Sequence, residues 1–184
     1  MNEGLISKRY AKALYGHAAE MHEESLLYHR MQILAALWRK MPDLKNSLRS
    51  PMITMDEKAG LLRNATGKNA EQSYLDFVNL VVANHRLESV LMIALSYQVI
   101  YRQRKHISVV HLVSANQLPY KVLERIRLYT EQQTHGKVEF SNRIDPSIVG
   151  GFIFQLNDLR IDASVKGQLD RINRQLAQIN KSII

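Results

Sequence analysis

Residues that could carry out catalysis are scattered along this sequence of 184 residues. It has seven histidines, seventeen acidic residues and no cysteine. His106 and His111 are five positions apart, so on one strand they would point to opposite faces and could not share a metal ion. Asp145, Asp158 and Asp162 each stand at an expected turn or helix start, where aspartate has a structural reason to occur. We therefore predict a protein with no catalytic residues, no metal site and no cofactor.

The pair Gly150-Gly151 resembles a phosphate-binding loop only superficially. Such a loop leads from a strand through glycines into the N-terminus of a helix, usually with Lys and Ser or Thr at fixed positions. Here the glycines lead into residues 152–156, in which Phe and Leu alternate with Ile and Gln as in a strand. The prediction is that both glycines allow close backbone packing where the chain enters a sheet.

A tight hairpin is expected directly after the glycines. Asn157-Asp158 has the length of a two-residue turn, and residues 159–161 return as the second strand. In that register Leu156 faces Leu159 and Phe154 faces Ile161, so one side of the hairpin is apolar.

A C-terminal helix should follow the hairpin, with Asp162 or Ser164 as its N-cap. Its apolar positions recur at steps of four and three, which is compatible with a coiled-coil seam as well as with a sheet-facing stripe. These positions are Val165, Leu169, Ile172, Leu176 and Ile179.

The first 105 residues show helical periodicity nearly throughout, interrupted at Pro42 and Pro51. The spacing of Thr54 and Glu57 predicts a capping box at the start of a fourth helix, which should run to Gly67. The pattern predicts six helices, and for four of them it indicates which residues point inward. These are Leu5 or Ile6, Tyr10, Ala13, Leu14, His17 and Met21 in the first helix, and Leu26, Ile33, Leu34 and Leu37 in the second. In the fifth helix they are Tyr74, Phe77, Val78 and Val81, and in the sixth Leu91, Leu95 and Val99.

After residue 105 the hydrophobic period changes from that of helices to that of strands. Residues 106–113 alternate and are rich in Val and Ile, and a helix that carries Val122, Ile126 and Tyr129 follows Pro119. The predicted fold is mainly α with a smaller α+β part: a six-helix bundle in residues 1–105, then a small mixed domain in residues 106–184. The order of elements in the second domain is β, α, three β, α.

The net charge of +8 permits a nucleic-acid-binding alternative, but the charge is spread over both halves. Residues 1–105 hold 15 basic and 10 acidic groups, and residues 106–184 hold 10 and 7. The dense run at residues 102–105 is typical of a solvated helix end. An RNA-binding domain would use Phe152 and Phe154 for stacking, yet the sequence around them lacks an Arg/Lys-Gly-Phe signature.

Three segments resemble one known family. The C-terminal part resembles the signature of the delta subunit of bacterial F-type ATP synthases, the family of the mitochondrial oligomycin-sensitivity-conferring protein. The matching segments are the run Asp-Pro-Ser-Ile-Val-Gly-Gly, the hairpin, and the later run Asp-Ala-Ser-Val-Lys-Gly-Gln-Leu. Residues 7–15 resemble the opening helix of that family, and residues 82–87 resemble the end of its fifth helix. The family usually has Gly-Asp in the hairpin turn, but Asn157 also tolerates the left-handed conformation. The signature residues are Asp145, Gly150, Gly151, Asp162 and Ser164.

The resemblance implies a non-catalytic subunit of the peripheral stalk that connects the catalytic head to the membrane-anchored b subunits. It implies that the N-terminal segment of an alpha subunit docks as a helix on the first and fifth helices, whereas periodicity alone favours a core stripe there. The expected alpha-binding residues are Tyr10, Ala13, Leu14, His17, Phe77, Val81 and Asn84, and those for the b subunits are Leu169, Ile172, Leu176 and Ile179.

The expected location is the cytoplasmic face of the bacterial inner membrane, in peripheral attachment through the complex. The sequence shows no secretory signal and no run of about 18 apolar residues that would span a membrane. Neither nucleic acid nor a small-molecule substrate is expected as a partner.

Overall fold

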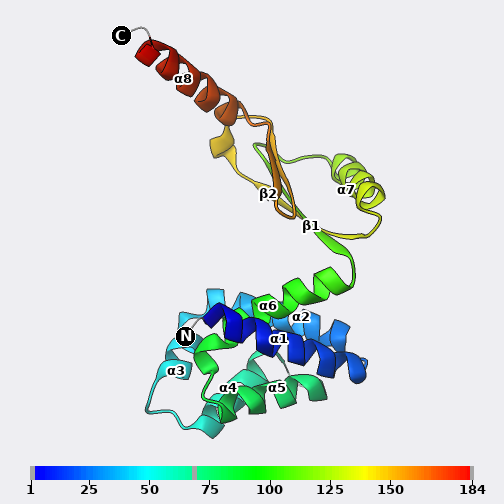
Figure 1. Cartoon of the computed structure of the whole chain (residues 1–184), viewed down its shortest axis with the longest axis vertical. Coiled ribbons are helices and arrows are strands. Elements are labelled where there is room, and N and C mark those ends of the chain that lie inside the picture. The colour runs from blue at the N-terminus through cyan, green and yellow to red at the C-terminus, as the bar shows by residue number, and fades with distance from the viewer. Residues whose placement is uncertain (1–2, 68–69, 183–184) are drawn as a thin grey trace. The chain divides into compact units, whose positions relative to one another are not determined.

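The chain is mostly helical, with a small mixed sheet of four strands (Figure 1). The computed structural model describes residues 3–67 and 70–182, and it describes side chains for residues 4–67 and 70–175. The chain divides into two compact units, Met1–Lys105 and His106–Ile184. Within the described residues no helix has both the length and the apolar character needed to cross a membrane.

The first unit is helical in its described part. The elements are α1 (Glu3–Glu20), α2 (Glu24–Lys40), α3 (Pro42–Arg49), α4 (Met55–Ala65), α5 (Gln72–Ala83), the 3₁₀ helix η1 (Leu87–Ser89) and α6 (Val90–Arg104).

Two of these boundaries confirm predictions from the sequence. Helix α2 ends at Lys40, and Pro42 occupies the first turn of α3, where its missing N–H costs nothing. At the start of α4, the backbone N–H of Glu57 donates to the Thr54 hydroxyl at 3.3 Å, and the backbone N–H of Thr54 donates to the Glu57 carboxylate at 2.8 Å. This is the predicted capping box.

The core of the first unit agrees with the predicted inward face for α5 but not for α1. Tyr74, Phe77, Val78 and Val81 are all buried. On α1 the buried residues are mostly small, because this helix packs closely along α6. They are Ser7, Ala11, Leu14 and Ala18, so of the expected stripe Leu14 is buried, whereas Leu5, Ala13, His17 and Met21 are exposed.

The predicted inward faces of α2 and α6 were only partly right: Leu34 of α2 is buried, and Leu37 and Leu91 are half-buried. Leu26 and Ile33 of α2 are exposed, as are Leu95 and Val99 of α6. The residues buried on the two helices include aliphatic side chains and several that combine an apolar body with a polar end. Besides Leu34 they are Leu27, Tyr28, Met31 and Ala35 on α2, and Val90, Ile93, Ala94, Tyr97, Gln98 and Tyr101 on α6.

Two of the polar ends in this contact donate to backbone carbonyls of α2. Gln98 donates from Nε2 to the Met31 carbonyl at 3.0 Å, and the Tyr97 hydroxyl donates to the Glu24 carbonyl at 3.1 Å. The rings of Tyr28 and Tyr101 stack with centroids 4.2 Å apart. The spacing of aliphatic residues does not reveal this buried face, because the burial of tyrosine and glutamine side chains depends on hydrogen bonds to partners distant in the sequence.

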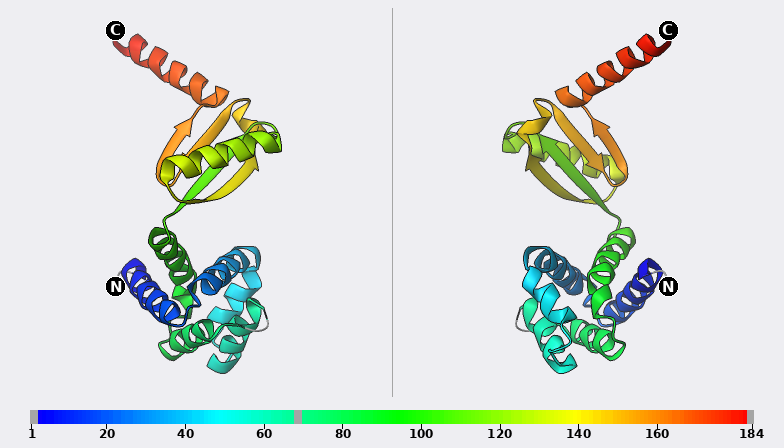
Figure 2. Two further views of the ribbon diagram at one scale, coloured as in Figure 1. Left: turned by 90° about the vertical axis from the view of Figure 1, so that its right-hand side faces the viewer. Right: turned by 90° about the vertical axis from the view of Figure 1, so that its left-hand side faces the viewer.

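The second unit has the predicted order of elements. Its sheet has the strand order β2-β1-β3-β4, in which β1 and β2 are parallel and the other neighbours are antiparallel. Figure 2 shows α7 across one face of the sheet and α8 extending beyond the strands. The elements are β1 (Ile107–Ser114), α7 (Tyr120–Thr134), β2 (Lys137–Ile144), the 3₁₀ helix η2 (Pro146–Ile148), β3 (Phe152–Leu156), β4 (Leu159–Asp162) and α8 (Val165–Ser182).

The hairpin has the predicted register. Leu156 pairs with Leu159, and Phe154 pairs with Ile161. Asn157 takes the left-handed conformation at φ 50°, and its side-chain oxygen also accepts the Val109 backbone N–H at 2.9 Å. The turn residue therefore ties the hairpin to β1 as well as closing it.

The signature residues of the second unit have structural roles. Gly151 has φ 73°, and a Cβ atom there would lie 2.2 Å from the carbonyl oxygen of Ala163. The Ser164 hydroxyl accepts the Gly167 N–H at 3.0 Å, as an N-cap does, and donates to Asp162 at 2.6 Å. That hydrogen bond and the one from the Ser164 N–H hold the pKa of Asp162 below its ordinary value.

Asp145 makes the same kind of turn before η2. Its carboxylate accepts from the hydroxyl of Ser147 at 2.6 Å and from the backbone N–H of Ser147 at 3.0 Å. Gly150 lies close to the start of α8, since a Cβ atom on it would come within 3.1 Å of Val165 Cγ2. Gly151 therefore serves close backbone packing, as the sequence predicted, whereas the nearest atom to a Cβ at Gly150 belongs to a side chain.

Candidate partner-binding sites

A groove runs between α1 and α5 in the first unit. Its volume is about 440 Å³. The walls are mainly apolar, and two arginines lie among them. The lining residues are Ile6, Arg9, Tyr10, Ala13, Leu80 and Arg86. Ala13 is exposed and small, and Leu80 is 49% exposed, so apolar surface faces solvent here without a partner from the described chain.

The structure separates the seven expected alpha-binding residues into three groups. Tyr10 and Ala13 line the groove. Leu14, Phe77 and Val81 belong to the core; Phe77 is 2% exposed and Val81 0%. These three side chains are packed in this structure and present little surface to a partner, and their alpha-binding role stays a prediction. His17 and Asn84, the remaining two, are exposed but are not among the lining residues.

Leu80 is the apolar wall residue that sequence reasoning missed. It lies out of phase with the buried stripe of α5, between Asp76 and Asn84 on the exposed side. An isolated leucine on a polar helix face is common and carries little signal by itself. Its position opposite Ala13 becomes informative only once α1 and α5 are placed side by side.

His17 joins the two walls beyond the lined groove. Its Nε2 lies 3.0 Å from Oδ2 of Asp76, so the pair connects α1 to α5. Gln72 donates to the other oxygen of the same carboxylate at 2.8 Å. The hydrogen bond with His17 and then that with Gln72 lower the pKa of Asp76. The expected alpha-binding role of His17 thus remains a prediction, and its observed contact is a link between the walls.

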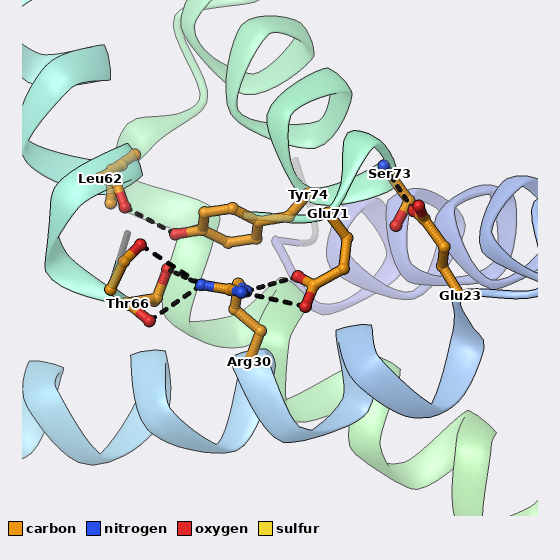
Figure 3. Close-up of polar contacts among 8 residues, drawn as sticks. Glu23, Arg30, Leu62, Thr66, Glu71, Ser73 and Tyr74 are labelled. Carbon is orange, nitrogen blue, oxygen red and sulfur yellow. Dashed lines mark hydrogen bonds and ion pairs between the residues drawn. The ribbon is translucent and has the colours of Figure 1, made fainter. Parts of the chain in front are cut away.

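Helix α5 is held in place by a polar cluster at its N-terminus (Figure 3). Arg30 of α2 donates from Nη2 to Glu71 Oε1 at 2.9 Å and from Nη1 to the Thr66 carbonyl at 2.9 Å. Its guanidinium lies 5.6 Å from the centroid of the Tyr74 ring, a cation–π distance. One side chain therefore links α2, the end of α4 and the start of α5.

Two further hydrogen bonds complete this anchor. The Tyr74 hydroxyl donates to the Leu62 carbonyl at 2.8 Å, and the backbone N–H of Ser73 donates to the carboxylate of Glu23 at 2.9 Å. Burial raises the pKa of Tyr74, so it stays a neutral donor. The hydrogen bonds with Ser73 lower the pKa of Glu23. The anchor fixes the wall that carries Leu80.

The Arg30–Glu71 pair predicts an acid-sensitive first unit. Burial raises the pKa of Glu71, but the hydrogen bonds from Arg30, a backbone hydrogen bond at Glu71 and the charge of Arg30 together outweigh burial and leave this pKa below its ordinary value of 4.5. The folded state then binds fewer protons than the unfolded state, so this stabilisation is present above pH 4.5 and is lost as the pH falls through the folded pKa. We expect Glu71→Gln to lower the free energy of unfolding at neutral pH by about 2 kcal/mol and to flatten its decline in acid.

Urea unfolding between neutral and acid pH measures both effects. Glu88→Gln is the matched control, because Glu88 pairs with Arg49 at 3.1 Å while both side chains are more than half exposed. An exposed pair of this kind contributes little. Equal pH profiles for Glu71→Gln and the unmodified chain would show that the Arg30–Glu71 pair does not cause the loss of stability in acid.

A second, larger groove lies in the second unit between α7 and the sheet. Its volume is about 990 Å³. Helix α7 packs toward β2 and leaves the β3–β4 side of the same sheet face open. The apolar lining includes Leu112, Val122, Ile126, Tyr129, Phe152, Phe154 and Ile161. Val122 is exposed and Tyr129 is 64% exposed, so both present apolar surface to the groove.

The face of α8 is similarly open. Leu169 is 53% exposed and Ile172 51%. The other two residues expected to contact b subunits, Leu176 and Ile179, lie outside the side chains that the structure describes. Helix α8 contacts η2 near its beginning. The described part of its apolar stripe therefore faces solvent.

The aromatic residues of the RNA-binding alternative lie in the larger groove. Phe152 and Phe154 line it together with aliphatic side chains, and Arg125 is the one cation among its lining residues. Stacking of bases needs exposed aromatics interleaved with cations along a strand-wide path. The lining favours an apolar protein segment over RNA.

Two apolar grooves, one in each unit, are typical of an adaptor protein that binds other chains. The family comparison agrees with this class. The model of the ATP synthase delta (OSCP) subunit family matches residues 6–176. The chain therefore belongs to the ATP synthase delta (OSCP) subunit family, as the sequence motifs indicated. It is accordingly a non-catalytic ATP synthase subunit with a peripheral-stalk role.

Individual relatives match over nearly the whole length. ATP synthase subunit delta of Phocaeicola vulgatus is 36% identical over 182 residues, which are 98% of each chain. The same subunit of Bacteroides thetaiotaomicron is 37% identical over 186 residues, covering 100% of both. A chain in the cryo-EM structure of the Toxoplasma gondii mitochondrial ATP synthase hexamer has the same fold, with a TM-score of 0.72 at 20% identity over 96% of this chain and 98% of that one.

Proposed function

We propose that this chain ties the catalytic head of a bacterial ATP synthase to the membrane-anchored b subunits. In this proposal the six helices of residues 1–105 act as one bundle that binds the N-terminal segment of an alpha subunit. Residues 106–184 bind the b subunits. The chain sits at the cytoplasmic face of the inner membrane and resists rotation of the head, so that torque from proton flow drives synthesis.

The observation that carries the proposal is the α1–α5 groove. It offers an apolar surface between two helices, which is the usual receptor for an amphipathic helix. Tyr10 and Leu80 provide the large side chains, and Ala13 leaves room between them for a side chain of the incoming helix. The Arg30 cluster and the His17–Asp76 pair hold the walls together before a partner binds, and preorganisation of this kind lowers the entropy lost on binding.

The second unit supports a separate attachment. Its groove lacks a helix over β3 and β4, and a helix from a b subunit alongside α7 would cover Phe152 and Ile161. The stripe of α8 offers a further apolar seam to the same partner. Two linked attachments resist load better than one, since release of either leaves the other to hold its partner at high local concentration.

The b-binding role of α8 predicts the effect of a double substitution. Leu169→Gln with Ile172→Gln should weaken binding of a soluble b dimer about tenfold or more, because two half-exposed apolar side chains lose their burial in the complex. Arg174→Gln is the control, since Arg174 lies on the opposite side of α8. Surface plasmon resonance with immobilised b dimer measures the three affinities. Equal binding by the double variant would remove α8 from the contact.

Titration calorimetry tests the alpha-binding role. The full chain is titrated with a peptide of about 20 residues, the length of a helix of about 30 Å, from the N-terminus of the alpha subunit of the same organism. The expected result is one-to-one binding with a negative heat-capacity change, which reports apolar burial. Absence of binding to a demonstrably folded sample would contradict the proposal.

A further inference from the structure

The two arginines of the α1–α5 groove are not explained by the apolar contact itself. Arg9 and Arg86 both line the groove, Arg9 from α1 and Arg86 from just after α5. Among the described side chains no carboxylate is paired with either guanidinium. The nearest acidic residue of the α5 wall, Asp76, is engaged by His17 and Gln72.

The position of Arg86 is fixed by the backbone. His85 adopts φ 52°, and the backbone N–H of Arg86 donates to the Val81 carbonyl at 2.9 Å, which closes the C-terminus of α5. The helix dipole favours a cation at that point, but it is equivalent to only about half a charge. Two guanidinium groups therefore leave the groove with a net positive field beside Leu80 and Tyr10.

We propose that this groove selects an amphipathic helix that places carboxylates beside its apolar ridge, where Arg9 and Arg86 pair with them. The inference rests on the proposed function and adds the chemistry of the partner: the alpha segment should be acidic along the edges of its apolar face. Cations at the rim of an apolar groove raise the association rate and set the register of the partner, whereas the apolar contact supplies most of the affinity.

Lys8 and Lys12 provide the comparison within the same helix. They are exposed and follow the periodicity of α1 on its other flank, away from the lining residues. Replacing them removes the same net charge as replacing Arg9 and Arg86. A general effect of the basic surface would therefore appear equally in both pairs, whereas a specific contact would appear only in the groove pair.

The experiment compares two double variants of the full chain, Arg9→Gln with Arg86→Gln and Lys8→Gln with Lys12→Gln. The probes are the N-terminal alpha peptide of the same organism and a version in which every Asp and Glu is replaced by Asn or Gln. Fluorescence anisotropy at about 20 mM and about 500 mM salt measures affinity, because the Debye screening length shortens several-fold across that range.

The groove variant should bind the acidic peptide about two- to tenfold more weakly at low salt, and the lysine variant should bind as the unmodified chain does. The neutralised peptide and high salt should each remove the difference. Equal losses in the two double variants, equal binding of the two peptides, or an alpha segment without carboxylates would overturn the proposal. Failure of the unmodified chain to bind either peptide would instead contradict the proposed function.

Discussion

Ala13→Glu is expected to lower the affinity for the alpha N-terminal peptide about 100-fold or more, which corresponds to roughly 2.7 kcal/mol. Ala13 lines the groove together with Tyr10 and Leu80, and a longer side chain there would fill the space that we assign to the partner. The new carboxylate would also lie four residues after Arg9 and could pair with it, which would hold the side chain in the groove. A partner would then have to displace it or bury an unpaired charge.

The fold should tolerate this change. Ala13 is exposed, so its replacement removes no core packing, and thermal unfolding should shift by only a few degrees. Ala19→Glu is the matched control, because it introduces the same side chain on α1 outside the groove lining. Titration calorimetry with the alpha N-terminal peptide measures the affinities of the unmodified chain and of both variants. Full affinity in Ala13→Glu, or an equal loss in Ala19→Glu, would show that the alpha peptide does not bind in this groove.

Gly151→Ala is expected to destabilise the second unit by about 3 kcal/mol or more. The residue has φ 73°, which alanine adopts only at a cost, and the added Cβ would lie 2.2 Å from the Ala163 carbonyl oxygen and 3.2 Å from the Ser164 Cα. Both atoms are backbone and cannot rotate away. The start of α8 would have to shift, together with the hydrogen bond from the Ala163 N–H to the Phe152 carbonyl at 3.0 Å.

Hydrogen exchange resolved along the sequence measures this effect in each unit. Protection should fall in residues 106–175 and stay unchanged in the first unit, where the alpha peptide should still bind. Gly16→Ala supplies the control, since a Cβ at Gly16 meets no atom within 4 Å and alanine favours a helix. Unchanged protection of β3 and β4 in Gly151→Ala would show that the close approach has no structural role.

Local rules were sufficient to predict the hairpin and several helix ends. The pairing of Phe154 with Ile161 follows from the alternation and from the two-residue turn, since a shift by one residue would turn the apolar face outward. The capping box at Thr54 and the break before Pro42 likewise depend only on residues a few positions apart. Such features need no knowledge of the rest of the chain.

The packed faces and the grooves depend on tertiary placement and could not be predicted in the same way. Tyr97 and Gln98 are buried because backbone carbonyls of α2 accept their hydrogen bonds, and those partners lie more than 60 residues earlier. Leu80 becomes a groove wall only because α1 lies beside α5. On α7 the stripe of Val122 and Tyr129 has the period of a core face, but the sheet leaves part of that face uncovered. An apolar stripe therefore does not distinguish a core from a binding site.

Whether this chain bridges the catalytic head and the b subunits can be measured in one experiment. A soluble b dimer is immobilised, and the catalytic head from the same organism is passed over it with and without this chain. The account predicts that the head is retained only when the chain is present, and that Ala13→Glu or Leu169→Gln with Ile172→Gln each reduces retention. Retention of the head without the chain, or no retention with a chain that binds the b dimer, would contradict the proposed tie.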